Sequence, residues 1–217
     1  MRGALLLVAA MLALPGCDRT PAEDFPTRAP GSALTSSVPP AASSAVLPAV
    51  GPPPAALAGR CVRATPVSAP PAVSPGPAAG CPADPEGNQK VPVARVAFPD
   101  AAGAGAAVDA EVVSSEHDTM RGLMYRRSMP EEHAMLFDLR VRDDHQFWMH
   151  NTCIPLDLLY VDEDGLVVGI VENAPTLDDT SRGVGCPSRY VLEVNAGWSR
   201  RHGVKAGQRM TIPPEAK

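Results

Sequence analysis

The stretch Gln146-Phe-Trp-Met-His-Asn-Thr-Cys-Ile-Pro-Leu-Asp157 decides the fold of this chain, and Leu158-Leu-Tyr-Val161 continues it. It holds two of the nine aromatic residues found among 217, followed at once by polar groups, a proline and an acid. This order predicts a strand that ends at a shaped turn, with a second strand beginning at the acid. Aromatic and polar side chains therefore come together at the turn.

Short apolar segments on both sides of this turn alternate as strands do. The sequence predicts strands near residues 93–98, 108–113, 134–137, 156–161, 166–171, 190–194 and 209–212. Ser115 is a candidate helix N-cap, so a short helix is expected over Glu116–Tyr125, with a further helical turn within Asn195–His202. Short strands with frequent turns are typical of a sandwich or barrel. We expect an all-β fold with one or two short helices, arranged as a single antiparallel, jelly-roll-like β-sandwich.

The composition of the chain changes near residue 90. Sixteen of the 25 prolines lie between Pro21 and Pro85, and Phe25 is the only aromatic residue in 18–90. Such a segment buries too little apolar surface to offset the entropy lost on ordering. Residues 18–90 are therefore predicted to be a disordered linker, and residues 91–217 the folded domain. The net charge of −5 gives no support for nucleic-acid binding.

The first 17 residues have the order of a bacterial lipoprotein signal peptide. Arg2 supplies the positive charge, Ala4–Leu14 form a short apolar core, and Leu14-Pro-Gly-Cys17 resembles the lipobox, whose cysteine carries lipid. Pro15 departs from the usual lipobox residue, which leaves a plain secretory signal as the alternative. We expect an exported protein that is anchored to a membrane of the cell envelope through Cys17 and faces the periplasm, with the inner and outer membranes both open.

The four remaining cysteines favour disulfides, because their number is even and the chain is expected to be exported. Cys61 and Cys81 lie in the predicted linker, whereas Cys153 and Cys186 lie in the predicted domain. The economical pairing joins Cys61 to Cys81 and Cys153 to Cys186. Buried, unpaired thiols are the alternative.

Several short motifs resemble the family called domain of unknown function 192 (DUF192), found in bacteria and archaea. They are Gly122-Leu-Met124, Met135-Leu-Phe137, Phe147-Trp-Met149, Asn151-Thr152 with Ile154-Pro-Leu-Asp157, and Val191-Leu-Glu193 with Gly197. The resemblance covers residues 90–213. It implies a compact, mainly antiparallel β-sandwich that is often exported, and it implies no reaction. Cys153 and Cys186 look like additions to the general family pattern.

The candidate site lies at the central turn, because loops at one end of a β domain commonly carry binding groups. The candidate ligand-binding residues are Trp148, His150, Asn151, Thr152 and Asp157. Glu193, on a different strand, would give Asp157 a second carboxylate for general acid–base catalysis.

Each of these residues also has a structural interpretation. Asn151 and Thr152 would cap their own turn, and Asp157 would bind backbone amides or an arginine. Arg121, in the predicted helix, is a possible ionic partner of Asp157 or Glu193. Trp148, between Phe and Met, would be half buried in the core.

Three functions fit the sequence. The leading hypothesis is a membrane-tethered binding or accessory module for a saccharide or another small polar ligand. The second is a hydrolase that uses Asp157 and Glu193, so whether the protein is an enzyme stays open. The third is copper handling through Met120, Met124, Met129, Met135, Met149, His117, His133, His145 and His150. Methionines also fill cores, and the sequence holds no H-x-x-x-H pattern, so no metal and no cofactor is expected.

The three hypotheses predict different geometries. Two carboxylates in one solvent-filled cleft would favour the hydrolase, and methionines and histidines that converge near the surface would favour copper. An exposed Trp148 without either arrangement would favour the binding module.

Overall fold

The structure is a computed structural model that describes residues 57–103 and 105–217. The predicted signal peptide, its Cys17 and the linker up to residue 56 lie outside the described residues. Among the described residues, no helix is both long enough and apolar enough to span a bilayer.

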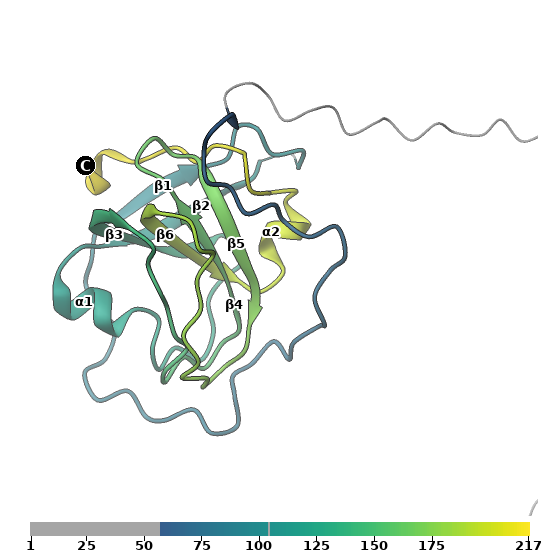
Figure 1. Cartoon of the computed structure of the whole chain (residues 1–217). Helices are drawn as coiled ribbons and strands as arrows, with labels where there is room; N and C mark the ends of the chain where they lie inside the picture. The colour runs from purple at the N-terminus through teal and green to yellow at the C-terminus, as the bar shows by residue number, and fades with distance from the viewer. Residues whose placement is uncertain (1–56, 104) are drawn as a thin grey trace, which may run out of the picture. The chain divides into compact units, whose positions relative to one another are not determined.

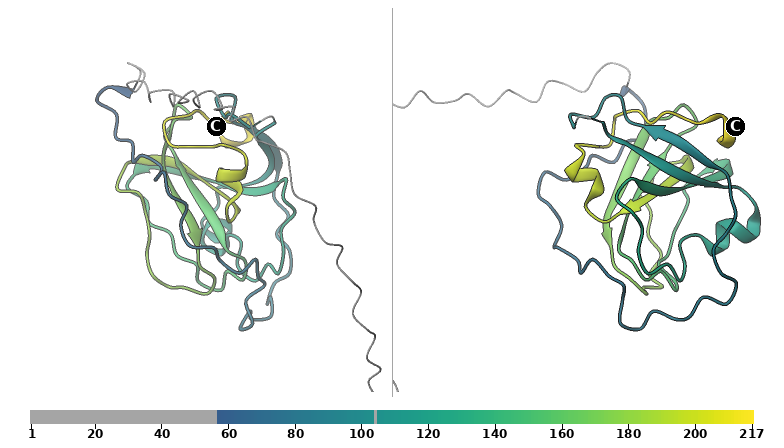
Figure 2. Two further views of the ribbon diagram at one scale, coloured as in Figure 1. Left: turned by 90° about the vertical axis from the view of Figure 1, so that its right-hand side faces the viewer. Right: turned by 180° about the vertical axis from the view of Figure 1, so that it is seen from behind.

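The described residues form one six-stranded sheet in the order β1-β2-β3-β6-β4-β5 (Figure 1). Its strands are β1 (Val93–Ala97), β2 (Ala107–Val113), β3 (His133–Asp143), β4 (Leu156–Val161), β5 (Val167–Ala174) and β6 (Ser188–Asn195). The helices are α1 (Glu116–Arg121), α2 (Trp198–Arg201) and the short 3₁₀ turn η2 (Pro214–Ala216). The two α-helices lie at opposite edges of the domain (Figure 2).

The prediction of a mainly β domain with short helices is confirmed, but the antiparallel sandwich is not. Strands β2 and β3 are parallel, with Asp109 opposite His133, while the other neighbouring strands are antiparallel. A parallel pair needs a crossover, and the segment that contains α1 returns the chain to the level at which β2 began. The alternation of apolar residues predicted these strands, but it did not predict the crossover between β2 and β3.

The sheet carries an apolar core on each face because successive side chains point to opposite sides. In β6, Leu192 and Val194 belong to one core and Val191 to the other. Trp198 of α2 packs in the first core, which also holds Leu192. The second core includes Met149 from the central stretch. Every residue of β4 is buried, as expected for a strand that is covered on both faces.

The strand predicted for the first half of the central stretch is wrong. Strand β3 instead continues to Asp143, and residues 144–155 form a loop. Phe147 forms only an isolated antiparallel bridge with Arg182. Asn151, with φ of 52°, occupies the left-handed region that asparagine tolerates. The shaped turn that the sequence predicted is therefore present, but a loop leads into it.

Helix α1 starts as predicted, because the Ser115 hydroxyl accepts a hydrogen bond from the Asp118 amide at 3.1 Å. It ends before the predicted Tyr125, because Gly122 follows with a φ of 48°. A Cβ atom at Gly122 would lie 3.2 Å from the Phe137 ring, so the chain passes close to β3 here.

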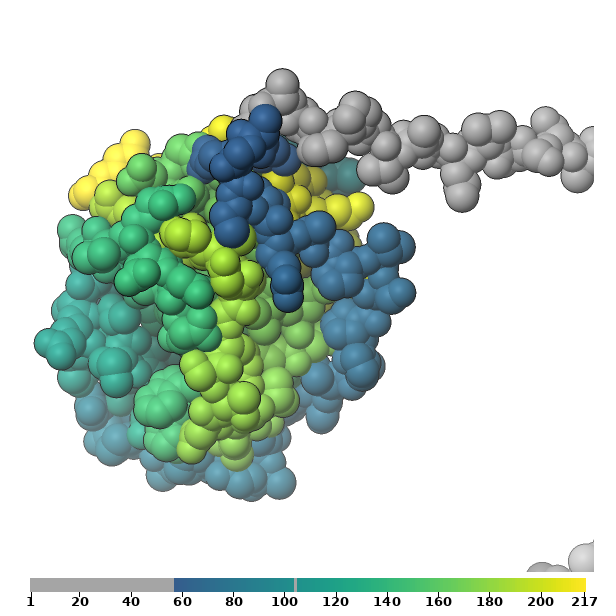
Figure 3. Space-filling view, viewed as in Figure 1, coloured from purple at the N-terminus to yellow at the C-terminus, as the bar shows by residue number. Residues whose placement is uncertain are grey.

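Residues 57–92, assigned by composition almost entirely to the linker, pack against the domain as an extended segment that we call the strap (Figure 3). The Arg63 amide donates to the Val168 carbonyl at 2.7 Å. The Arg200 guanidinium donates to the carbonyls of Pro66 and Ser68, both at 2.8 Å. A proline-rich chain offers many carbonyl acceptors, and arginines of the domain bind them. The ordered part of the chain therefore begins well before residue 91.

Two disulfides fasten the strap, and their pairing corrects the expected one. Cys61 bonds to Cys186 with a Cα–Cα distance of 5.5 Å, and Cys81 bonds to Cys153 at 5.3 Å. The economical pairing fails because the strap extends along the domain between its two cysteines. Each strap cysteine therefore meets a different part of the domain. In the chain-entropy model, closing loops of this size contributes roughly 4–5 kcal/mol per bond.

The pairing can be tested by tryptic mapping without reduction. Cleavage after Arg60, Arg63, Lys90, Arg142, Arg182 and Arg189 places each of the four cysteines in its own peptide. We expect peptide 61–63 to be linked to 183–189, and peptide 64–90 to 143–182. Mass spectrometry that finds 61–63 linked to 64–90 would contradict the strap geometry.

Candidate functional site

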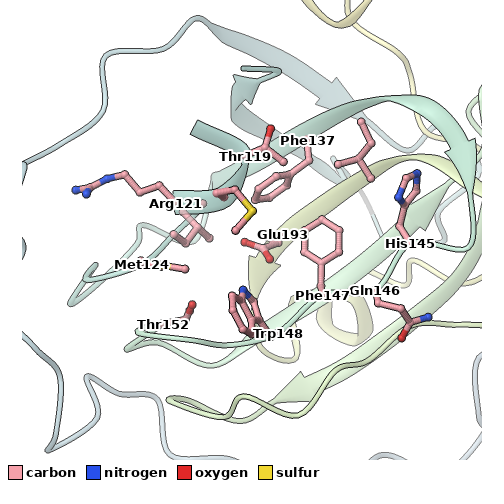
Figure 4. A pocket seen from close by; sticks show the side chains of 14 residues that line it. Thr119, Arg121, Met124, Phe137, His145, Gln146, Phe147, Trp148, Thr152 and Glu193 are labelled. Atoms are coloured by element: carbon pink, nitrogen blue, oxygen red, sulfur yellow. The ribbon is translucent and has the colours of Figure 1, made fainter. Parts of the chain in front are cut away.

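A cavity of about 180 Å³ opens between α1 and the loop that carries Trp148 (Figure 4). Phe137 of β3 and Glu193 of β6 form its floor on the second-core face of the sheet. Residues 119–124 form one wall, and residues 145–148 with Thr152 form the other. We call this cavity the Glu193 pocket. Its lining mixes apolar side chains, including three aromatic rings and two thioethers, with polar ones, and Glu193 supplies the single carboxyl among them.

The Glu193 side chain is buried where the sheet is otherwise apolar. In the sheet register, Glu193 lies opposite Met135 of β3 on one side and Leu158 of β4 on the other. The residue is only 5% exposed. Its carboxyl points into the middle of the pocket (Figure 4). No residue in 57–103 or 105–217 forms a hydrogen bond with it. Burial raises the pKa of Glu193 to about 8, although the charge of Arg126 opposes the shift. Glu193 is therefore mostly neutral near pH 7.

The nearby arginines are engaged elsewhere. The two terminal N–H groups of Arg126 donate hydrogen bonds to the Glu111 carboxylate, each at 2.5 Å. Arg121 turns away from the pocket and donates to Asp84 at 2.5 Å and to the Gly87 carbonyl at 2.7 Å, both on the strap. The sequence offered Arg121 as a partner of Glu193 or Asp157, and it pairs with the strap instead.

Of the predicted site residues, Trp148 and Thr152 join Glu193 in lining the pocket. Trp148 is 46% exposed and stacks on the His150 ring, with centroids 5.0 Å apart. His150 lies outside the pocket, where its Nδ1 is 2.7 Å from an Asp179 carboxylate oxygen. Trp148 is therefore an exposed aromatic surface at the pocket mouth rather than a buried core residue.

Asn151 has a structural role, but it contacts the segment after α1 instead of capping its own turn as the alternative interpretation had it. Its side-chain amide donates to the Tyr125 hydroxyl at 3.1 Å, and its carbonyl accepts from the Tyr125 amide at 2.8 Å. The hydroxyl of Thr152 donates to the His150 carbonyl at 3.2 Å, within the same turn. These bonds hold the turn against the segment that follows α1, which keeps the two walls of the pocket at a fixed separation.

Asp157 lies on the other face of the sheet and is fully buried. It accepts hydrogen bonds from the backbone amides of Asn173 at 2.9 Å, Gly197 at 3.0 Å and Ser199 at 3.1 Å. These bonds fix the start of α2 and join it to β5. Asp157 is paired with Val194, one residue beyond Glu193, so the two carboxylates point to opposite faces. The proposed catalytic pair is not assembled.

The nine candidate methionines and histidines are divided among several places, and His145 is the one histidine of the set that lines the Glu193 pocket. Met129, Met135 and Met149 are buried in the second core, whereas Met120 and Met124 line the Glu193 pocket. The histidine partners are separate as well: His117 pairs with Glu86 at 3.1 Å, and His145 Nε2 lies 2.8 Å from the Val141 carbonyl. Within the described part of the chain, no three His, Cys, Asp or Glu side chains are placed to hold a metal ion.

Sequence reasoning missed several residues of the pocket. Phe137, Phe147, Thr119 and Gln146 all line it. Phe137 and Phe147 were visible as motif residues, and their rings stand edge to face with centroids 5.2 Å apart. Their convergence depends on how α1 crosses the sheet, which alternation patterns do not encode.

The family model of DUF192, described as an uncharacterized ACR, matches residues 99–212. The chain belongs to this family. Each disulfide joins a strap cysteine outside the matched residues to a cysteine inside them. The DUF192 match includes all of the residues that line the Glu193 pocket.

Two solved structures are similar to this DUF192 chain. One is a “putative transcription regulator” from Sinorhizobium meliloti 1021, with 36% identity, a TM-score of 0.55, and coverage of 58% of this chain and 97% of that chain. The other is a protein of unknown function from Novosphingobium aromaticivorans DSM 12444, with 30% identity, a TM-score of 0.55, and coverage of 63% and 95%. No curated protein matches the chain.

Burial of Glu193 predicts a specific dependence of stability on pH. Because its pKa rises from 4.5 to about 8 on folding, the folded state binds more protons than the unfolded state between these values. The contribution of the neutral carboxyl is full below about pH 4.5 and is lost as pH rises toward 8, by roughly 5 kcal/mol in total. The free energy of unfolding, measured with urea at a series of pH values, should fall in this way for the native chain. It should change less with pH for Glu193→Gln.

The matched control is Glu163→Gln, which removes the same charge from an exposed turn. It should keep the native pH profile. Equal slopes in the native chain and Glu193→Gln would show that Glu193 titrates normally.

Proposed function

We propose that this protein is a binding module, anchored to the cell envelope through Cys17, that takes a saccharide or another small polar ligand in the Glu193 pocket. The observation that carries the proposal is a buried carboxyl without a hydrogen-bond partner among the described residues, aimed into a cavity with aromatic walls. A mainly apolar pocket with a few polar groups and a perturbed carboxyl is the usual form of a small-molecule site.

The energetics of Glu193 support a binding role over a structural one. Burying a polar group without a partner costs free energy that an apolar residue at the same position would not. Asp157 illustrates the contrast, because its carboxylate is also buried but accepts three backbone hydrogen bonds. Glu193 contributes no comparable bond to the fold, so its carboxyl is available for a ligand.

The competing functions lack a supporting geometry. The hydrolase hypothesis needs Asp157 and Glu193 in one cleft, and their side chains face opposite sides of the sheet. Copper handling needs methionines and histidines that converge, and the candidates are divided: Met120, Met124 and His145 line the Glu193 pocket, Met129, Met135 and Met149 lie in the second core, and His117 and His150 contact carboxylates outside the pocket. The Sinorhizobium meliloti protein is named a “putative transcription regulator”, but the net charge of −5 on this chain gives no support for nucleic-acid binding.

Export to the periplasm is part of the same proposal. Its support is the signal-peptide order of residues 1–17 and the two disulfides, because such bonds persist mainly in oxidising compartments. The residues between Cys17 and the strap would then serve as a tether, and their proline-rich composition suits that role.

The binding role is tested by a small-molecule screen on the full chain, with the melting temperature as readout. A ligand that binds the native state raises this temperature. We expect hits that shift the native chain and Glu163→Gln equally, and that fail to shift Trp148→Ala and Glu193→Gln. A binding role for this pocket would be refuted by a library without hits. It would also be refuted by hits that raise the melting temperatures of Trp148→Ala and Glu193→Gln as much as that of the native chain.

Lipid anchoring is tested by Cys17→Ser. The native chain should partition with membranes and enter the detergent phase, because the acyl chains on Cys17 would insert into the bilayer. The variant should lack the lipid and leave the detergent phase. A Cys17→Ser chain that carries lipid and fractionates as the native chain does would show that the anchor lies elsewhere.

A further inference from the structure

We infer that the ligand of the Glu193 pocket carries a positively charged nitrogen, an organic ammonium group that Phe137, Phe147 and Trp148 contact and that the Glu193 carboxylate neutralises. The inference rests on the proposed binding function and narrows its ligand class. It comes from three features of the pocket: an unpaired carboxyl, a wall of aromatic rings, and nearby cations that are already paired.

The Glu193 carboxyl supplies the negative charge when it releases its proton on binding the cation. Glu193 is buried and has no hydrogen-bond partner within the described ranges, and its oxygens point into the cavity (Figure 4). An ammonium group that enters the cavity would form a charge-assisted hydrogen bond or a direct ion pair with this carboxylate. Because Glu193 is only 5% exposed, water would screen this attraction less than it does at the protein surface.

The aromatic walls supply a second interaction with a cation. Phe137, Phe147 and Trp148 line the same cavity as the carboxyl, together with the thioethers of Met120 and Met124. A cation near an aromatic face is attracted by the ring quadrupole, and rings grouped around a cavity are a common way to bind quaternary ammonium groups. A neutral ligand would gain no such electrostatic attraction from these rings.

The charged groups around Glu193 leave this position open for an external cation. From the α1 wall, Arg121 is turned to Asp84 of the strap. Beside the pocket, Arg126 is held by Glu111 of β2. On β4, the hydroxyl of Tyr160 donates to the Arg182 carbonyl at 2.8 Å.

Two histidines complete the titratable groups near the pocket. His145, in the loop wall, has its Nε2 at 2.8 Å from the Val141 carbonyl. His150 lies outside the pocket, stacked on Trp148. None of these groups is paired with the Glu193 carboxyl.

The polar lining argues against a saccharide as the occupant. A sugar carries many hydroxyls that each need a partner, and the pocket offers few: apart from Arg121 and Glu193, its polar side chains are Thr119, His145, Gln146, Trp148 and Thr152. The Thr152 hydroxyl is already bonded to the His150 carbonyl. One charged head with a small apolar body matches this lining better.

The test is isothermal titration of the full chain with choline, tetramethylammonium and n-butylammonium. The matched neutral probe is the alcohol in which carbon replaces the nitrogen of choline. We expect at least one cation to bind at least tenfold more tightly than the neutral alcohol. Because the cation selects the ionised carboxylate, affinity should rise about tenfold from pH 6 to pH 7, with release of about one proton per ligand in that range.

Two variants test whether Glu193 is the group that binds the cation and releases the proton. Glu193→Gln should reduce cation affinity at least tenfold and abolish the proton release. Glu116→Gln, which removes a charge from the exposed first turn of α1, should retain both. The proton release of the native chain is an independent readout if Glu193→Gln folds poorly.

The remaining outcomes overturn the inference. Equal binding of choline and the neutral alcohol, or affinity that falls as pH rises, would show that a neutral group occupies the pocket. Failure of all three cations, beside a small-molecule screen with pocket-dependent hits, would reject the ammonium group and leave the binding function in place. Failure of the cations and of the screen would reject both.

Discussion

The register between β4 and β6 is the constraint on which the rest of this structure depends. Leu158 lies opposite Glu193, and Asp157 lies opposite Val194. Because side chains alternate along a strand, this register sends the two carboxyls to opposite faces. A slip of one residue would turn Asp157 to the second-core face of the sheet, beside Leu156 and Leu158, and remove its three backbone partners. The register thus separates a carboxylate that holds the fold together from one that faces the cavity.

The contrast between the two acids shows how the same residue chemistry serves two purposes. Asp157 accepts three amide hydrogen bonds, so its carboxyl oxygens have partners inside the protein. Glu193 has no such bonds among the described residues, and burial keeps its carboxyl mostly protonated at neutral pH because its pKa is about 8. A folded protein retains an unbalanced group at the cost of stability. The position of this group in a cavity gives that cost a functional interpretation.

Local signals in the sequence predicted the six strands and the start of the first helix, but the strand expected at residues 209–212 is only an isolated bridge between Leu166 and Arg209. The alternation of β1, β2 and β4–β6 is visible in their residues, and Ser115 identified the start of α1. The order of the strands was not predictable, because the β2–β3 crossover depends on packing between distant segments. Composition misled the assignment of the strap, since a proline-rich segment with two cysteines can be held by cross-links and by arginines of the domain. The sequence also identified Trp148, Thr152 and Glu193, but it added Asp157, because both carboxyls follow apolar runs and only the sheet register distinguishes their faces.

The strap holds both walls of the Glu193 pocket. One wall of the pocket contains Arg121, whose guanidinium is bound by Asp84 and Gly87 of the strap. The opposite wall ends at Thr152, and the next residue, Cys153, is bonded to Cys81 of the same strap. Both walls are thus attached to one segment over the short stretch from Cys81 to Gly87. A segment that lies outside the family match therefore braces a pocket that lies within it, and the separation of the pocket walls depends on covalent and ionic contacts that the domain alone does not supply.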